Sequence, residues 1–158
     1  SFAKPYARKM NTQSHAKHPS EKMESLIGQL RKEQVSCVIY AQGATQLFRE
    51  RGVKDLFRLL KEEPEWLRGA LVADKVVGKA AAALMAKGKI KELYTDTISM
   101  PALQLLQAAH IPVEFGEVVP YIRNRNNTGW CPLETRCYEE NSLDTLFTII
   151  DRFIKSKV

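Results

Sequence analysis

The alternation of strand-like and helix-like segments between residues 69 and 119 constrains the fold most. A short apolar run at 69–73 is typical of a buried strand, and 92–96 and 111–119 are further strand candidates, the last interrupted by Pro112 and Gly116. Between them lie two helical patterns, an alanine-rich one at 78–87 and one at 99–109 with proline in its first turn. Strands joined through helices run parallel. This region therefore predicts a βαβαβ unit.

The flanking segments complete a layered domain. The further expected elements are a helix capped by Ser20, strands at 35–40 and 45–50 joined by a Gln42-Gly43 turn, a helix at 53–60, a short helix from Cys131, and a last helix capped by Ser142. This order predicts an α/β fold, a three-layer α/β/α sandwich on a mixed sheet of about five strands.

Charge divides the chain into two parts. The net charge is +6, and four positive charges without an acidic one lie in residues 1–19, so residues 20–158 carry only +2. We expect 1–19 to be a basic tail, either a flexible arm or an added end, and 20–158 to be a single domain. Nucleic-acid binding through this tail is an alternative function, ranked third because the domain itself is almost neutral.

The cysteine content and the apolar runs bear on location. Three cysteines are an odd number and form no disulfide framework pattern, which favours a reducing compartment. No apolar run approaches the length of a membrane helix. We therefore expect a cytoplasmic protein without a membrane partner.

Three familiar site chemistries are not expected, because residues that they need are missing. A phosphate-binding loop needs a glycine five residues before Gly78 and a serine or threonine after Lys79, but Ala73 and Ala80 stand there. Outside the tail the sequence has one histidine, His110, so neither a zinc site nor a Ser-His-Asp triad is expected. We expect no metal and no cofactor.

The first candidate site is the start of the helix at 78–87. The preceding strand is expected to end at Asp74, and small residues from Gly78 onward would leave backbone N–H groups open to an anion. Asp74 would accept from a ribose hydroxyl or act as a base, and Lys79 would contact phosphate. Lys75 and Ala80 complete the predicted contacts. The alternative is that the small residues only permit close packing and the lysines are solvated.

The second candidate site is the segment that leads into the helix after Cys131. Cys131 is expected at the N-cap, where the positive helix end and the guanidinium groups of Arg123 and Arg125 would activate its thiol as a nucleophile. Glu134 would take part in ligand binding. The alternative is a structural or ligand-contacting cysteine, with Glu134 stabilising the first turn of its own helix.

The two most specific stretches are 71–82 (LVADKVVGKAAA) and 129–134 (GWCPLE). Through them, residues 24 to 155 resemble a small bacterial and archaeal family of unknown function with a cytidine-deaminase-like fold. The resemblance implies a deaminase-like domain at 20–158, in agreement with the element order derived above.

The same resemblance implies that deaminase chemistry is absent. In deaminases a His/Cys-x-Glu motif and a Pro-Cys-x-x-Cys motif hold zinc. Here the sequences at those positions are Val-Gly-Lys-Ala-Ala at 77–81 and Ser-Met-Pro-Ala at 99–102. We therefore expect the domain to bind a small nucleotide-like or other anionic metabolite, with metal-free chemistry by Asp74 or Cys131 left open. The alternative is a non-catalytic interaction or dimerisation module.

Overall fold

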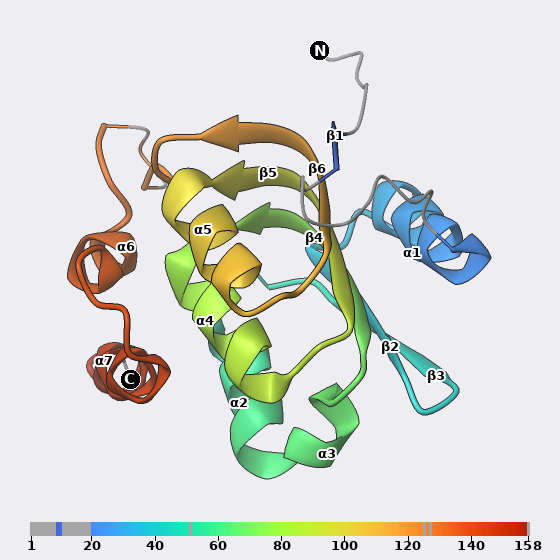
Figure 1. The fold of residues 1–158 in the computed structure, drawn as a ribbon, viewed down its shortest axis with the longest axis horizontal. Helices are drawn as coiled ribbons and strands as arrows, with labels where there is room; N and C mark the ends of the chain where they lie inside the picture. Colours follow the sequence, from blue (N-terminus) through green and yellow to red (C-terminus); the bar gives the residue numbers. More distant parts are fainter. Residues whose placement is uncertain (1–8, 11–19, 51, 125, 127, 158) are drawn as a thin grey trace.

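The computed structural model describes residues 9–10, 20–50, 52–124, 126 and 128–157. Within this part of the chain, six strands form one sheet in the order β1-β6-β5-β4-β2-β3 (Figure 1). The strands are β1 (Lys9–Met10), β2 (Cys37–Ala41), β3 (Ala44–Phe48), β4 (Leu71–Val77), β5 (Glu92–Ser99) and β6 (Val113–Val119). The helices are α1 (Glu21–Lys32), α2 (Lys54–Glu62), α3 (Pro64–Leu67), α4 (Lys79–Gly88), α5 (Met100–Ala108), α6 (Pro132–Cys137) and α7 (Leu143–Lys155).

Helices cover both faces of the sheet. On one face α1 packs on β2 and β4, and its apolar stripe is buried, as the spacing of Met23, Leu26, Ile27 and Leu30 predicts. The remaining helices lie on the other face, where α4 contacts α2, α5, α6 and α7 (Figure 1). The three-layer α/β/α sandwich is confirmed.

The strand pairing is mixed. β2 pairs antiparallel with β3 and with β4, whereas β4, β5 and β6 run parallel. The predicted hairpin and the predicted βαβαβ unit are therefore both present. The short strand β1 pairs with β6 and belongs to the segment expected to be a tail. The other residues of 1–19 lie outside the described part of the chain.

The predicted ends of two strands are wrong. β4 does not end at Asp74 but continues to Val77, and β5 continues beyond Asp96 to Ser99. Charged side chains interrupt the apolar pattern at these positions, although the backbone pairing continues past them. Asp74 consequently lies inside a strand rather than at its carboxyl end.

Near Asp74 in β4 and Asp96 in β5, the regular alternation of side chains between the two faces of the sheet is interrupted. Val72 and Val77 belong to the same core although they are five positions apart, and regular alternation would place them on opposite faces. Leu93 and Ile98 show the same shift in β5. Figure 1 shows the carboxyl-terminal parts of these strands curving over the layer of α4 and α5. This curvature brings the strand ends above the start of α4.

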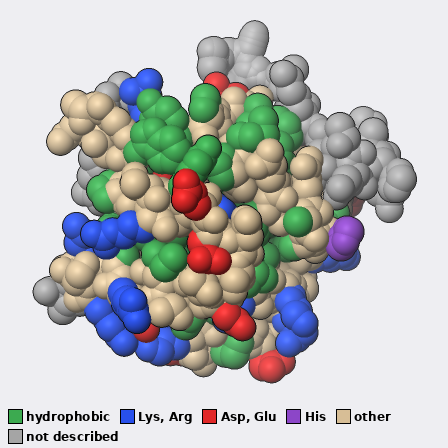
Figure 2. Space-filling view, turned by 60° about the vertical axis from the view of Figure 1, so that its left-hand side comes forward, with side chains coloured by type: hydrophobic (Ala, Val, Ile, Leu, Met, Phe, Trp, Pro, Cys, Tyr) green, Lys and Arg blue, Asp and Glu red, His purple; other side chains and the backbone are tan. Residues whose placement is uncertain are grey.

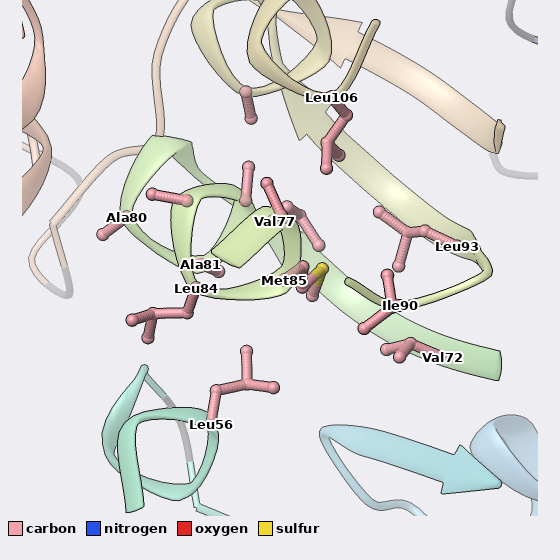
Figure 3. Close-up of a cluster of buried hydrophobic side chains, with 14 of the residues drawn as sticks. Leu56, Val72, Val77, Ala80, Ala81, Leu84, Met85, Ile90, Leu93 and Leu106 are labelled. Atoms are coloured by element: carbon pink, nitrogen blue, oxygen red, sulfur yellow. The ribbon is translucent and has the colours of Figure 1, made fainter. Parts of the chain in front are cut away.

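The main core lies between the sheet and α4. Leu84 and Met85 of α4 contact this core together with Leu93 of the sheet and Leu106 of α5 (Figure 3). The alanines of α4 are buried at 7 % exposure or less, so the small residues serve close packing. Close packing thus accounts for this stripe of small residues, but the expectation that Lys79 is solvated is wrong, because Lys79 is only 5 % exposed. Among the described residues, no helix is long and apolar enough to span a membrane.

Candidate functional site

The two segments singled out in the sequence meet at the start of α4. Gly78 is the N-cap of this helix and has no side chain to satisfy the first N–H groups. The Glu134 carboxylate does so instead: Oε1 accepts from the N–H of Lys79 at 2.7 Å and Oε2 from the N–H of Ala80 at 3.2 Å. An anion therefore does occupy this helix terminus, and it comes from α6.

Glycine at position 78 makes room for this carboxylate. A Cβ on Gly78 would lie 2.5 Å from the Glu134 carboxyl carbon, closer than such atoms approach in proteins. Glu134 is 8 % exposed, and its burial raises the pKa of the carboxyl group, while the two N–H donors oppose that rise.

This geometry bears on two expectations. Glu134 lies in the first turn of its own helix, as expected, but its carboxylate bonds to the start of α4. The N–H groups of Lys79 and Ala80 are not open to an external anion while Glu134 is in place. Ligand contact at Gly78 therefore stays a prediction that requires α6 to move away.

Lys79 is also used within the protein. Its Nζ donates to the carbonyl oxygen of Tyr138 at 2.8 Å, and the residue is only 5 % exposed. Burial lowers the pKa of the ammonium group. Because Tyr138 is the C-cap of α6, this contact places a cation at the negative end of that helix. Phosphate contact by Lys79 was predicted, yet the ammonium is directed to a backbone carbonyl.

Asp74 lies beside Cys37 rather than beside the second segment. The two residues are directly opposed in β4 and β2, and the Cys37 thiol donates to the Asp74 carboxylate. The Val76 N–H donates to the same carboxylate at 3.4 Å. Burial of this carboxylate raises the pKa of Asp74 to about 7. Lys75, next to it, is half-buried.

Cys131 is the N-cap of α6, as predicted, but its side chain makes no capping hydrogen bond. The residue is half-buried and packs against the main core. Its role as a nucleophile stays a prediction. Arg123 is bridged to Trp130 through the backbone, and Arg125 lies outside the described residues.

Sequence reasoning missed three aromatic side chains near α6. The rings of Tyr121 and Trp130 stack with centroids 4.7 Å apart, and Trp130 meets Tyr138 edge-on at 4.8 Å. We call Tyr121, Trp130 and Tyr138 the aromatic ladder. The guanidinium of Arg123 lies 5.5 Å from the Tyr121 ring centre. The available signal was position, since Trp130 and Tyr138 flank the short helix at its two ends.

A shallow groove adjoins the ladder. Its volume is about 880 Å³, and it is lined by Trp130, Thr135, Arg136, Tyr138, Glu139, Glu140 and Ile149. We call it the α6 groove. Figure 2 turns α6 and α7 toward the viewer and shows hydrophobic side chains gathered in the upper part of this face, with acidic and basic side chains spread below. The groove thus offers aromatic surface together with both signs of charge.

Metal ligands are not gathered in the described part of the chain. No three histidine, cysteine or carboxylate side chains lie together there in a way that would hold an ion. The two segments that the sequence analysis set against the deaminase motifs, 77–81 and 99–102, are the starts of α4 and α5, where Gly78 and Ser99 are the N-caps.

The comparisons with known proteins place this layered α/β domain, with its internally capped helix, in a family. The profile of a domain of unknown function, DUF1893 (TM1506), matches residues 25–154, and the chain belongs to this family. A crystal structure of a DUF1893 family protein (TM1506) from Thermotoga maritima is similar with a TM-score of 0.77 and 27% sequence identity, over 89% of this chain and 93% of that one. No curated protein matches the chain.

Proposed function

We propose that this DUF1893 domain is a cytoplasmic binding protein of the deaminase-like fold class that binds a nucleotide-like ligand without zinc-dependent deamination. The observation that carries the proposal is the aromatic ladder with Arg123 at one end. A planar base would stack on the ladder, and its phosphate would pair with an arginine.

The chemistry of the α6 groove supports this choice. Tyr138 is 47% exposed, so part of its ring is open to a ligand. Stacking of a base on an aromatic side chain contributes about 1–3 kcal/mol. Arg136, which lines the groove, and Arg123, which lies over the Tyr121 ring of the ladder, would supply cations for a phosphate, while Glu139 would accept from an amino group of the base.

The proposed ligand site is the α6 groove and not the N-terminus of α4. The sequence predicted an anion at Gly78, and that position holds the Glu134 carboxylate. The α6 groove is lined by α6, the residues that flank it and Ile149 of α7, so the second predicted segment keeps its place in the site. The three free cysteines, Cys37, Cys131 and Cys137, fit a reducing cytoplasm.

Trp130 fluorescence tests the proposal directly. The chain has two tryptophans, so a Trp66→Phe variant leaves Trp130 as the only one. In this variant, adenosine monophosphate is expected to quench Trp130 saturably. Tyr138→Ala should weaken binding on the order of tenfold, as loss of a stacking ring implies. Adenosine and ribose 5-phosphate, each lacking half of the ligand, should both bind less tightly.

Removal of one arginine at a time separates a specific phosphate contact from a general effect of positive charge on binding. Arg123→Ala should weaken binding of adenosine monophosphate but not of adenosine, whereas Arg152→Ala, on the exposed side of α7, should change neither. Absence of saturable quenching up to millimolar ligand, or equal binding by the Tyr138→Ala variant, would overturn the proposal.

A dimerisation module is the second candidate function, and it is favoured by one observation. Val76, Met100 and Val118 are exposed apolar residues close to the carboxyl ends of the parallel strands, at 47, 42 and 39% exposure. A second copy of the chain would cover such residues. Sedimentation equilibrium is then expected to show a dimer that Met100→Lys dissociates, and a monomer at all concentrations would reject this candidate.

A further inference from the structure

The contact between α4 and α6 joins the internal anion site to the proposed ligand surface. Three hydrogen bonds make this contact: two from α4 N–H groups to Glu134 and one from Lys79 to the carbonyl of Tyr138. Glu134 is near the start of α6 and Tyr138 is its C-cap, so both ends of the helix are attached to α4.

The short length of α6 makes these bonds decisive for its position. A helix of six residues is too short to be stable alone, so tertiary contacts must hold it. Leu133 and Cys137 anchor it in the main core through apolar contact. Apolar contact is not directional, whereas the carboxylate and the ammonium each meet a defined backbone group.

The aromatic ladder depends on the placement of α6. Trp130 immediately precedes the N-cap Cys131, and Tyr138 follows the last residue of the helix. The two rings, which meet edge-on with centroids 4.8 Å apart, therefore come from opposite ends of α6. A rotation or a partial unwinding of this helix would separate the two rings and change the shape of the groove.

Burial of the charged groups also needs an explanation beyond packing. An apolar residue at position 134 would bury its side chain without the cost of removing a charge from water. The two charges instead satisfy both helix ends, the N-terminus of α4 by an anion and the C-terminus of α6 by a cation. We propose that Glu134 and Lys79 are positioning residues that hold Trp130 and Tyr138 in the geometry that binds the ligand.

This inference rests on the proposed function, but its first readout needs no ligand. In the Trp66→Phe background, Glu134→Gln keeps the shape of the side chain and replaces one acceptor oxygen by an NH₂ group, which cannot accept from an α4 N–H. We expect the near-ultraviolet circular dichroism of the ladder to lose intensity and Trp130 emission to move to longer wavelength. Binding of adenosine monophosphate should weaken by about tenfold, the scale of one lost charge-assisted hydrogen bond.

Two further variants complete the experiment. Glu62→Gln makes the same chemical change on the exposed surface of α2 and should leave spectrum and binding unchanged. Lys79→Met retains the two N–H bonds to Glu134 and removes only the bond to Tyr138. It is expected to alter the near-ultraviolet spectrum on its own, which keeps the test valid if Glu134→Gln fails to fold.

The outcomes separate this inference from the proposed function. If the wild type binds no adenosine monophosphate but the spectra of Glu134→Gln and Lys79→Met change, the proposed function fails and the positioning role stands. If both variants lower the melting temperature while the ladder spectrum and ligand affinity equal those of the wild type, the residues only stabilise the fold and the inference is overturned.

Discussion

Four helices of this domain have their first N–H groups satisfied by a side chain, and they show two different arrangements. Three of them, α1, α5 and α7, have a serine N-cap whose hydroxyl accepts from an N–H three residues on: Ser20 from Met23, Ser99 from Ala102, and Ser142 from Thr145. At the start of α4, Gly78 has no such group, and Glu134 supplies the acceptor from 54 to 55 positions away. A local cap stabilises one helix, whereas the cap of α4 also fixes the position of another.

Asp74 and Glu134 provide a second contrast. Both are buried carboxylates, but only Glu134 lies at the start of a helix. Glu134 receives two N–H groups from the positive end of α4. Asp74 receives the Val76 N–H at a longer distance, 3.4 Å, together with the Lys75 N–H and the weakly donating Cys37 thiol, and none of these donors belongs to a helix start. The difference indicates that Asp74 should limit the stability of the protein at alkaline pH more than Glu134 does.

The largest expected effect is that of Asp74→Asn. The pKa of Asp74 is about 7 in the folded protein against an ordinary 3.8, so folding favours the protonated form. The stabilisation is present in full below pH 3.8 and is lost as the pH rises through 7. Relative to the wild type, the variant should gain about 1.4 kcal/mol per pH unit between pH 5 and 7, reaching up to about 4 kcal/mol at pH 8. Urea unfolding at pH 5, 6, 7 and 8 measures this gain.

Asp144→Asn is the matched control with the opposite sign. Lys87 lowers the pKa of Asp144, so the ionised form is favoured by folding and its stabilisation is lost as the pH falls. Asp144→Asn should therefore be slightly less stable than the wild type at neutral pH, and this difference in stability should disappear in acid. A gain for Asp74→Asn that stays constant from pH 5 to 8 would show that the carboxyl group does not titrate with folding.

Gly78→Ala tests the long-range cap. The added Cβ would lie within 2.6 Å of all three Glu134 carboxyl atoms, so the carboxylate must leave the N–H groups of α4. We expect a loss of about 3 kcal/mol, the scale for a disrupted buried charge or an overpacked site. Gly28→Ala is the control, because nothing lies within 4 Å of its added Cβ and alanine favours helix α1 by up to about 1 kcal/mol. Equal stability of the two variants would contradict the proposed role of Gly78.

Most of the fold could be predicted from the sequence because its signals are local. The hydroxyl of Ser142 and the turn at Gln42-Gly43 act over three or four residues, and the apolar stripe of α1 repeats every turn. The length of β4 could not be predicted in this way. Charges at Asp74 and Lys75 end the apolar run, but the backbone pairing with β5 continues to Val77.

The sequence predicted the two segments of the candidate site but not the contact between them. The absence of a local cap at Gly78 indicated that an anion belongs there, and the position of Glu134 in a second specific stretch was noted. That these two features satisfy each other could not be derived, because their contact depends on the tertiary packing of α6 against α4. The ladder was missed for the same reason, since the contact of the Tyr121 and Trp130 rings depends on the backbone pairing of Arg123 with Trp130.

The smallest expected effect is that of removing a local cap. Ser142→Ala removes the acceptor for the Thr145 N–H at an exposed helix start and should cost about 1 kcal/mol. The helix should remain in place, because Leu146 and Ile150 stay fully buried in the main core. The ladder spectrum should therefore equal that of the wild type while the urea midpoint falls. A loss as large as that of Gly78→Ala, or a change in Trp130 emission, would remove the distinction between a cap that only stabilises its helix and one that also positions a neighbour.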